Sequence, residues 1–94
     1  MNRDQNHAEI VKALKECGYS VLDLAMVGSG CPDILIGYKD AQGKPKNILV
    51  EIKTESGSLR PCQIDFFHSW QGSVMMTRNA NELLSTLEIL KSQK

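Results

Sequence analysis

The sequence has no excess of either charge, because eleven lysines and arginines balance eleven aspartates and glutamates. This balance argues against a strongly basic protein that coats nucleic acid indiscriminately, although it is compatible with local basic patches. The three cysteines are an odd number without a Cys-x-x-Cys spacing, which argues against a disulfide framework and against a zinc site. Free cysteines are typical of a reducing cytoplasm.

Long apolar segments, internal repeats and low-complexity linkers are also missing. The sequence therefore predicts neither a signal peptide nor a transmembrane helix, and we expect a cytoplasmic protein without a membrane partner. Residues 1–94 are enough for one small domain, and their 41% hydrophobic content allows only a shallow core. Domains of this size are often marginally stable alone, so we expect a homodimer.

A β-hairpin is the most informative feature that the sequence contains. Residues 32–38 and 47–53 are both rich in isoleucine, leucine and valine, as strands are. Between them, residues 39–46 contain Asp40, Gly43 and Pro45, which are typical of turns. The pattern predicts a hairpin with a longer loop, centred near Gln42 and Gly43.

The acidic residues of this hairpin are predicted to meet at one end. Asp33 begins the first strand and Glu51 and Lys53 end the second, so the pairing sets Asp33 opposite residues 51–53. Glu51 and Lys53 share a face because side chains alternate along a strand. Two neighbouring carboxylates repel each other, and a divalent cation relieves that repulsion. The hairpin therefore predicts a metal site, with a simple salt bridge at a strand end as the alternative.

Apolar spacing and turn residues predict helices and further strands on both sides of the hairpin. In chain order, they are a helix at 3–17, a strand at 19–24, the hairpin, a helix at 61–70, a strand at 73–77 and a helix capped by Asn79. We expect the helix at 61–70 to face the core with Ile64, Phe66, Phe67 and Trp70. The order αβββαβα predicts an α/β fold, in which helices flank a small mixed β-sheet.

Three motifs resemble the PD-(D/E)xK nuclease superfamily, and more narrowly its VRR-NUC domains. They are Ser29-Gly30 with Pro32-Asp33, then Glu51-Ile52-Lys53, and then Leu59-Arg60-Pro61-Cys62-Gln63. The resemblance covers nearly the whole chain and implies a restriction-endonuclease-like core.

The resemblance also implies roles for individual residues. It makes Asp33, Glu51, Lys53 and Gln63 catalytic, with Asp33, Glu51 and the carbonyl of Ile52 binding Mg²⁺ or Mn²⁺. Carboxylate and carbonyl oxygens suit both of these cations. Lys53 would stabilise charge beside the attacking water or the phosphate. Gln63 would hold a phosphate oxygen or that water.

One position departs from the resembled pattern. Holliday-junction resolvases of the superfamily carry an acidic residue on the first helix, and counting back from Gly18 places it at His7. His7 precedes Val11 by four residues, so we expect His7 and Asp4 to extend the apolar face and Glu9 to face water. A neutral imidazole binds Mn²⁺, which makes His7 a candidate metal ligand. The alternative is a half-buried histidine without a role.

These features predict a metal-dependent DNA endonuclease. The sequence has no helix-turn-helix, zinc finger or long recognition loop, so we expect it to recognise the shape of DNA. The resemblance implies branched DNA such as Holliday junctions, cleaved by a homodimer, in a phage or a bacterium. The substitution at His7 leaves open a DNA-binding module with weak or no catalysis. A thiol hydrolase using Cys31 or Cys62 is a third hypothesis, which the spacing of the cysteines does not support.

Overall fold

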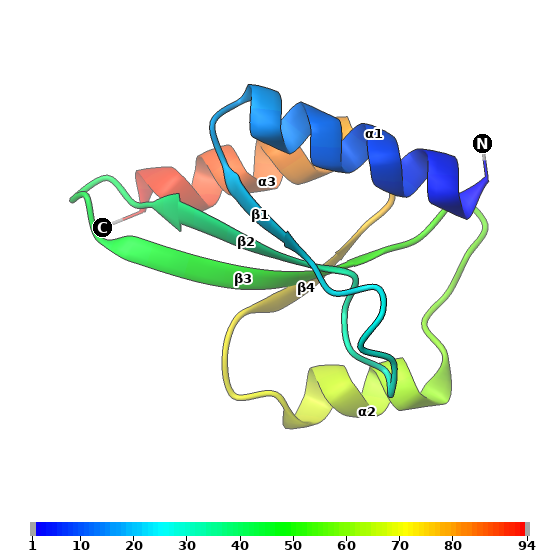
Figure 1. The fold of residues 1–94 in the computed structure, drawn as a ribbon. Helices are drawn as coiled ribbons and strands as arrows, with labels where there is room; N and C mark the ends of the chain where they lie inside the picture. The colour runs from blue at the N-terminus through cyan, green and yellow to red at the C-terminus, as the bar shows by residue number, and fades with distance from the viewer. Residues whose placement is uncertain (1, 94) are drawn as a thin grey trace.

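A four-stranded mixed sheet with three helices organises the computed structural model, which describes residues 2–93 (Figure 1). The elements are α1 (Arg3–Glu16), β1 (Ser20–Asp23), β2 (Ile34–Lys39), β3 (Pro45–Ile52), α2 (Pro61–Ser69), β4 (Val74–Thr77) and α3 (Ala80–Ser92). The predicted order αβββαβα and the mixed α/β sheet are confirmed. Within residues 2–93, no helix combines the length and apolar character needed to cross a membrane.

The strands lie in the order β1-β2-β3-β4, and the first three form an antiparallel meander. Helix α2 then connects β3 to β4, which pairs parallel to β3. In the hairpin, Ile34 pairs with Val50, so Asp33 lies opposite Glu51, within the predicted segment of residues 51–53. The parallel register sets Ile52 beside Thr77, so the end of β4 lies next to the Glu51–Lys53 segment.

The hydrophobic core lies between one face of the sheet and the helices α1 and α3, which Figure 1 shows on the same side. Strand alternation turns one set of aliphatic side chains to that face: Ile34, Ile36, Ile48, Val50 and Ile52. The helices contribute Ile10, Leu14, Leu83 and Leu87. Full burial of each such side chain contributes about 1.5–3 kcal/mol. The predicted cap of the last helix is also confirmed, because Asn79 accepts a hydrogen bond from the Glu82 N–H at 2.8 Å.

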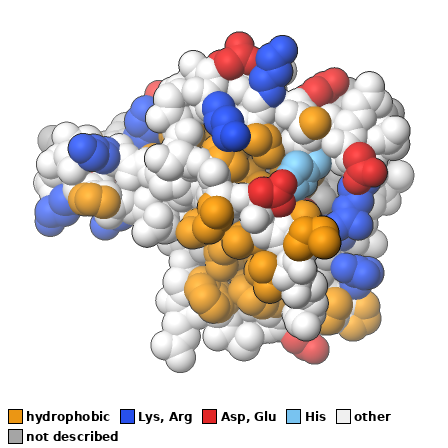
Figure 2. Space-filling model, viewed as in Figure 1, with side chains coloured by type: hydrophobic (Ala, Val, Ile, Leu, Met, Phe, Trp, Pro, Cys, Tyr) orange, Lys and Arg blue, Asp and Glu red, His pale blue; other side chains and the backbone are white. Residues whose placement is uncertain are grey.

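Helix α2 lies on the opposite face of the sheet and differs from the prediction (Figure 1). Ile64 and Trp70 are 40% and 48% exposed, so the expectation that they face the core is wrong. Phe66 stacks on Trp70, with ring centroids 5.2 Å apart, and the core cluster contains no α2 residue. Gln63 is the buried residue of this helix, so α2 is fixed through its first turn. Figure 2 shows hydrophobic side chains gathered on this lower half of the molecule.

The glycine loop before β2 is held in an unusual conformation. Gly28, Ser29 and Gly30 all have positive φ, at 76°, 55° and 78°. The loop packs against the start of α2, since a Cβ built on Gly30 would lie 2.8 Å from the Cys62 carbonyl oxygen. Such a Cβ on Gly28 would meet nothing within 4 Å. Gly30 is therefore required both by its φ and by the close approach of α2.

Replacing these two glycines by alanine separates the two requirements. We expect Gly28→Ala to lower the free energy of unfolding by about 1–2 kcal/mol, because it bears only the cost of the left-handed conformation. Gly30→Ala adds a steric clash with Cys62 and is expected to cost a further 1–3 kcal/mol, roughly. Urea denaturation of both variants measures the difference. Equal losses would contradict the close packing of the loop on α2.

Candidate active site

The open end of the β2–β3 hairpin brings together the predicted acids and lysine. Asp33 and Glu51 are only 4% and 1% exposed. The Ile52 N–H donates a 2.8 Å hydrogen bond to Asp33 Oδ2, and Lys53 Nζ lies 3.5 Å from Glu51 Oε2. Two carboxylates and an ammonium group therefore share a nearly water-free end of the sheet.

One oxygen of Glu51 has no partner. Its Oε2 accepts a 3.1 Å hydrogen bond from Gln63 Nε2, whereas its buried Oε1 accepts none from the residues that the structure describes. Burial and the neighbouring Asp33 carboxylate raise the pKa of the Glu51 carboxyl, and Lys53 lowers it; together they move this pKa from 4.5 to about 7. A buried oxygen without a hydrogen bond is costly, so this site favours a proton or a cation there.

The two acids provide a donor set that fits a divalent cation. Carboxylate oxygens are the ligands that Mg²⁺ and Mn²⁺ prefer, and Glu51 Oε1 is unused. In residues 2–93, no three or more His, Cys, Asp and Glu side chains converge in a way that could hold a metal. The acids would therefore need additional oxygen ligands. The Ile52 carbonyl remains a predicted ligand of the cation, while the Ile52 N–H donates a hydrogen bond that orients Asp33.

Gln63 lies at the predicted place but is engaged differently. Its side chain is buried, and both ends of the amide are used within the protein. Nε2 donates to Glu51, and Oε1 accepts a 2.9 Å hydrogen bond from the Arg60 N–H at the start of α2. Gln63 thus orients Glu51 relative to α2, rather than holding a free phosphate oxygen or water in this structure.

His7 is half-buried and faces the end of β1, where its Nε2 lies 3.2 Å from Asp23 Oδ2. No described contact joins it to Asp33 or Glu51, so its predicted role as a metal ligand gains no support from the geometry. Glu9 is exposed as predicted, but Asp4 is exposed too and does not extend the apolar face. The reason is that the buried face of α1 runs through Ile10 and Leu14 to Asn6, so Asn6 rather than His7 is buried beside the site.

Asn6 was not singled out from the sequence, yet it reaches the site from α1. Its Nδ2 donates to the Lys53 carbonyl at 3.2 Å and to the Arg78 carbonyl at 3.1 Å. The Lys53 N–H in turn donates to the Thr77 carbonyl at 2.9 Å. The backbone of Lys53 is therefore fixed on two sides. Asn6, Ile10 and Leu14 lie four residues apart, and this helical spacing could have predicted from the sequence that Asn6 faces the core.

Arg78 organises the loop that follows Lys53. Its Nη1 donates to the carbonyls of Thr54 and Gly57, both at 2.6 Å, and to that of Glu55 at 3.2 Å. One guanidinium thus fixes the chain immediately after the lysine. The sequence contains no local signal for this role, because the contacts span more than twenty residues.

Cys31 lies in an environment that is unfavourable for a nucleophilic thiolate. Burial raises the pKa of the Cys31 thiol, and the charges of Glu51 and Asp33 raise it further. A nucleophilic cysteine needs a lowered pKa, so the electrostatics oppose Cys31 as the nucleophile of a thiol hydrolase. Cys17 and Cys62 are free and exposed.

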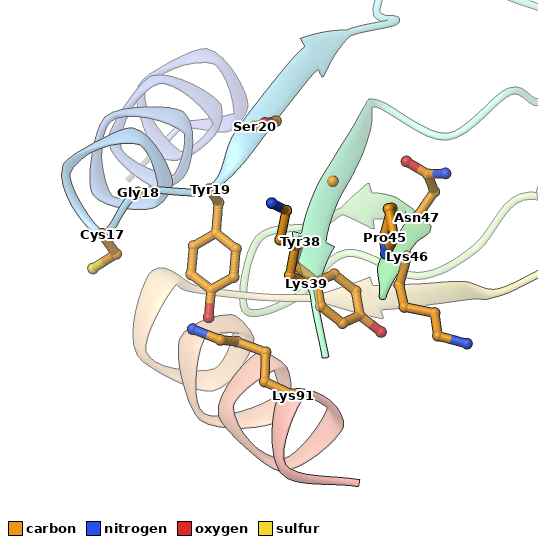
Figure 3. A pocket seen from close by; sticks show the side chains of 11 residues that line it. Cys17, Gly18, Tyr19, Ser20, Tyr38, Lys39, Pro45, Lys46, Asn47 and Lys91 are labelled. Atoms are coloured by element: carbon orange, nitrogen blue, oxygen red, sulfur yellow. The ribbon is translucent and has the colours of Figure 1, made fainter. Parts of the chain in front are cut away.

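A hollow of about 450 Å³ lies at the other end of the hairpin and contains different chemistry (Figure 3). It is lined in part by Lys39, Lys46 and Lys91, and Lys91 Nζ lies 5.1 Å from the centre of the Tyr19 ring. Burial and the adjacent Glu88 together raise the pKa of Tyr19 to about 12. Lys39 is six residues from Asp33 along β2, which corresponds to about 20 Å. The hollow is therefore separate from the acidic site.

The raised pKa of Glu51 predicts how stability depends on pH. The carboxyl holds its proton more tightly in the folded than in the unfolded protein, so ionisation of Glu51 opposes folding. Its destabilising effect is absent below about pH 4.5, grows between about pH 4.5 and 7, and is complete above that range. Glu51→Gln removes this titration. We expect the variant to gain about 2–3 kcal/mol over the wild type between pH 4 and 7.5, measured by urea denaturation. A pH-independent difference would contradict the assignment.

The chain matches no model of a known protein family, no curated protein and no solved structure. The relation to PD-(D/E)xK nucleases therefore rests on the sequence motifs and stays a prediction.

Proposed function

We propose that the protein is a metal-dependent DNA endonuclease with a VRR-NUC-like, restriction-endonuclease-like core. The buried pair of Asp33 and Glu51, with the unpartnered Glu51 Oε1 and the adjacent Lys53, carries this proposal. The arrangement is costly for an apoprotein, because two repelling carboxylates are kept out of water. Bound Mg²⁺ or Mn²⁺ would remove that cost.

The residues divide the chemistry of phosphodiester hydrolysis among them. A bound cation would polarise the phosphate and lower the pKa of a water. Asp33 and Glu51 would hold that cation, and Gln63 and the Ile52 N–H orient the two acids. Lys53 supplies a compact positive charge for the developing anionic charge, and the Asn6 and Thr77 contacts fix its backbone.

Branched DNA is the substrate that we propose, acted on by a homodimer. Residues 2–93 form one sheet with three helices and no separate recognition element, which favours a reader of DNA shape. Large hydrophobic side chains are exposed around the glycine loop and α2, including Met26 at 97% and Trp70 at 48%. Exposed apolar surface of this kind supports contact with a partner, and a second copy would give the two active sites that symmetric cleavage needs.

Cleavage of labelled four-way junction, flap and linear duplex DNA tests the proposal. With Mg²⁺ or Mn²⁺ we expect cutting of branched DNA, and with EDTA none. Lys53→Ala should bind the DNA but cut at least about 100-fold more slowly, because it removes one charge-stabilising group. Lys12→Ala is a matched control, since Lys12 is exposed on α1 and has no contact with the acids. Binding without cutting by the wild type would favour the DNA-binding module instead.

A further inference from the structure

Besides Lys53, a second positively charged side chain lies at the acidic pair, and it comes from the beginning of α1. Arg3 Nη2 lies 3.4 Å from Asp33 Oδ1, and the two residues are thirty positions apart in the chain. The Arg3 side chain is 64% exposed, whereas that of Asp33 is 6% exposed. An arginine that is mostly in water forms a weak ion pair, so this contact is readily exchanged.

When both carboxyls are ionised, the side chains of Lys53 and Arg3 balance the two acids one for one. Lys53 neighbours Glu51, and Arg3 neighbours Asp33. A divalent cation bound by the acids would add two positive charges to this balanced site. The excess charge would attract an anion, and Arg3, displaced from Asp33, would be free to bind it.

We propose that Arg3 is an exchangeable counterion, which pairs with Asp33 in the metal-free protein and binds a phosphate of the DNA backbone once a divalent cation holds Asp33. This inference rests on the proposed nuclease function. A guanidinium suits the second role, because its fork of N–H groups matches two phosphate oxygens.

Other basic groups of the site are less free to take this role. Lys53 is largely buried beside Glu51, and its backbone is bonded to Asn6 and Thr77. Arg78 uses its guanidinium on the carbonyls of the loop after Lys53. Arg3, in contrast, joins the site only through the end of a long and exposed side chain.

Two binding measurements on Arg3→Ala test the exchange: the Mn²⁺ affinity should not fall, whereas the affinity for DNA should. Titration calorimetry with Mn²⁺ alone should show affinity equal to or greater than that of the wild type, because a competing cation is gone. Fluorescence anisotropy with a labelled four-way junction and Ca²⁺ should show weaker binding. The slope of log affinity against log salt should fall by about one, as expected for one lost phosphate contact. A gel checks that the DNA stays intact.

Lys12→Ala removes the same charge from an exposed position of the same helix and should leave both the Mn²⁺ affinity and the salt slope unchanged. Arg3→Lys should retain part of the junction affinity. Weaker Mn²⁺ binding by Arg3→Ala would overturn the proposal, because Arg3 would then organise Asp33 for the metal. An unchanged salt slope would overturn it as well.

Asp33→Asn separates this inference from the proposed function. Loss of Mn²⁺ binding in Asp33→Asn, together with no effect of Arg3→Ala on DNA binding, overturns the role of Arg3 alone. If the wild type binds no Mn²⁺, or if Asp33→Asn binds it equally well, both the metal site and the exchange at Arg3 are overturned.

Discussion

The repulsion between Asp33 and Glu51 is the constraint on which the rest of the site depends. The antiparallel register sets the two acids opposite each other at a point where the sheet is already out of water. Each carboxylate then accepts a hydrogen bond from a different donor, the Ile52 N–H for Asp33 and the Gln63 amide for Glu51. These contacts fix the orientation of the acids but leave Glu51 Oε1 unsatisfied. The fold thus maintains a local instability that a cation or a proton would relieve.

The polar contacts around this pair explain why the site needs segments outside the hairpin that carries its acids. Asn6 comes from α1, Gln63 from α2 and Arg78 from the end of β4. The parallel pairing of β4 with β3 is what sets Thr77 and Arg78 beside Lys53. A hairpin alone would present the acids and the lysine without fixing the backbone that follows them.

The sequence predicted the parts of this arrangement that depend on local spacing. Strand alternation and turn residues were enough to set Asp33 opposite residues 51–53, and Pro61 marked the start of the helix that brings Gln63 to the site. The first helix was harder, because adjacent residues differ by about 100° around its axis. Counting from Val11 selected His7, whereas the buried residues Ile10 and Leu14 continue to Asn6. The exposed face of α2 and the contacts of Arg3 and Arg78 depend on packing between distant segments, which local patterns do not contain.

The two acids differ in how firmly their neighbours cover them, so the site is easier to approach from one side. Glu51 is enclosed by Gln63 and Lys53, while Asp33 is covered on one side by the exposed side chain of Arg3. Moving Arg3 breaks a single weak contact, whereas moving Gln63 would break two hydrogen bonds at the start of a helix. The easier approach to the pair is therefore from the beginning of α1. A cation entering there would meet Asp33 first and would then reach the unpartnered oxygen of Glu51.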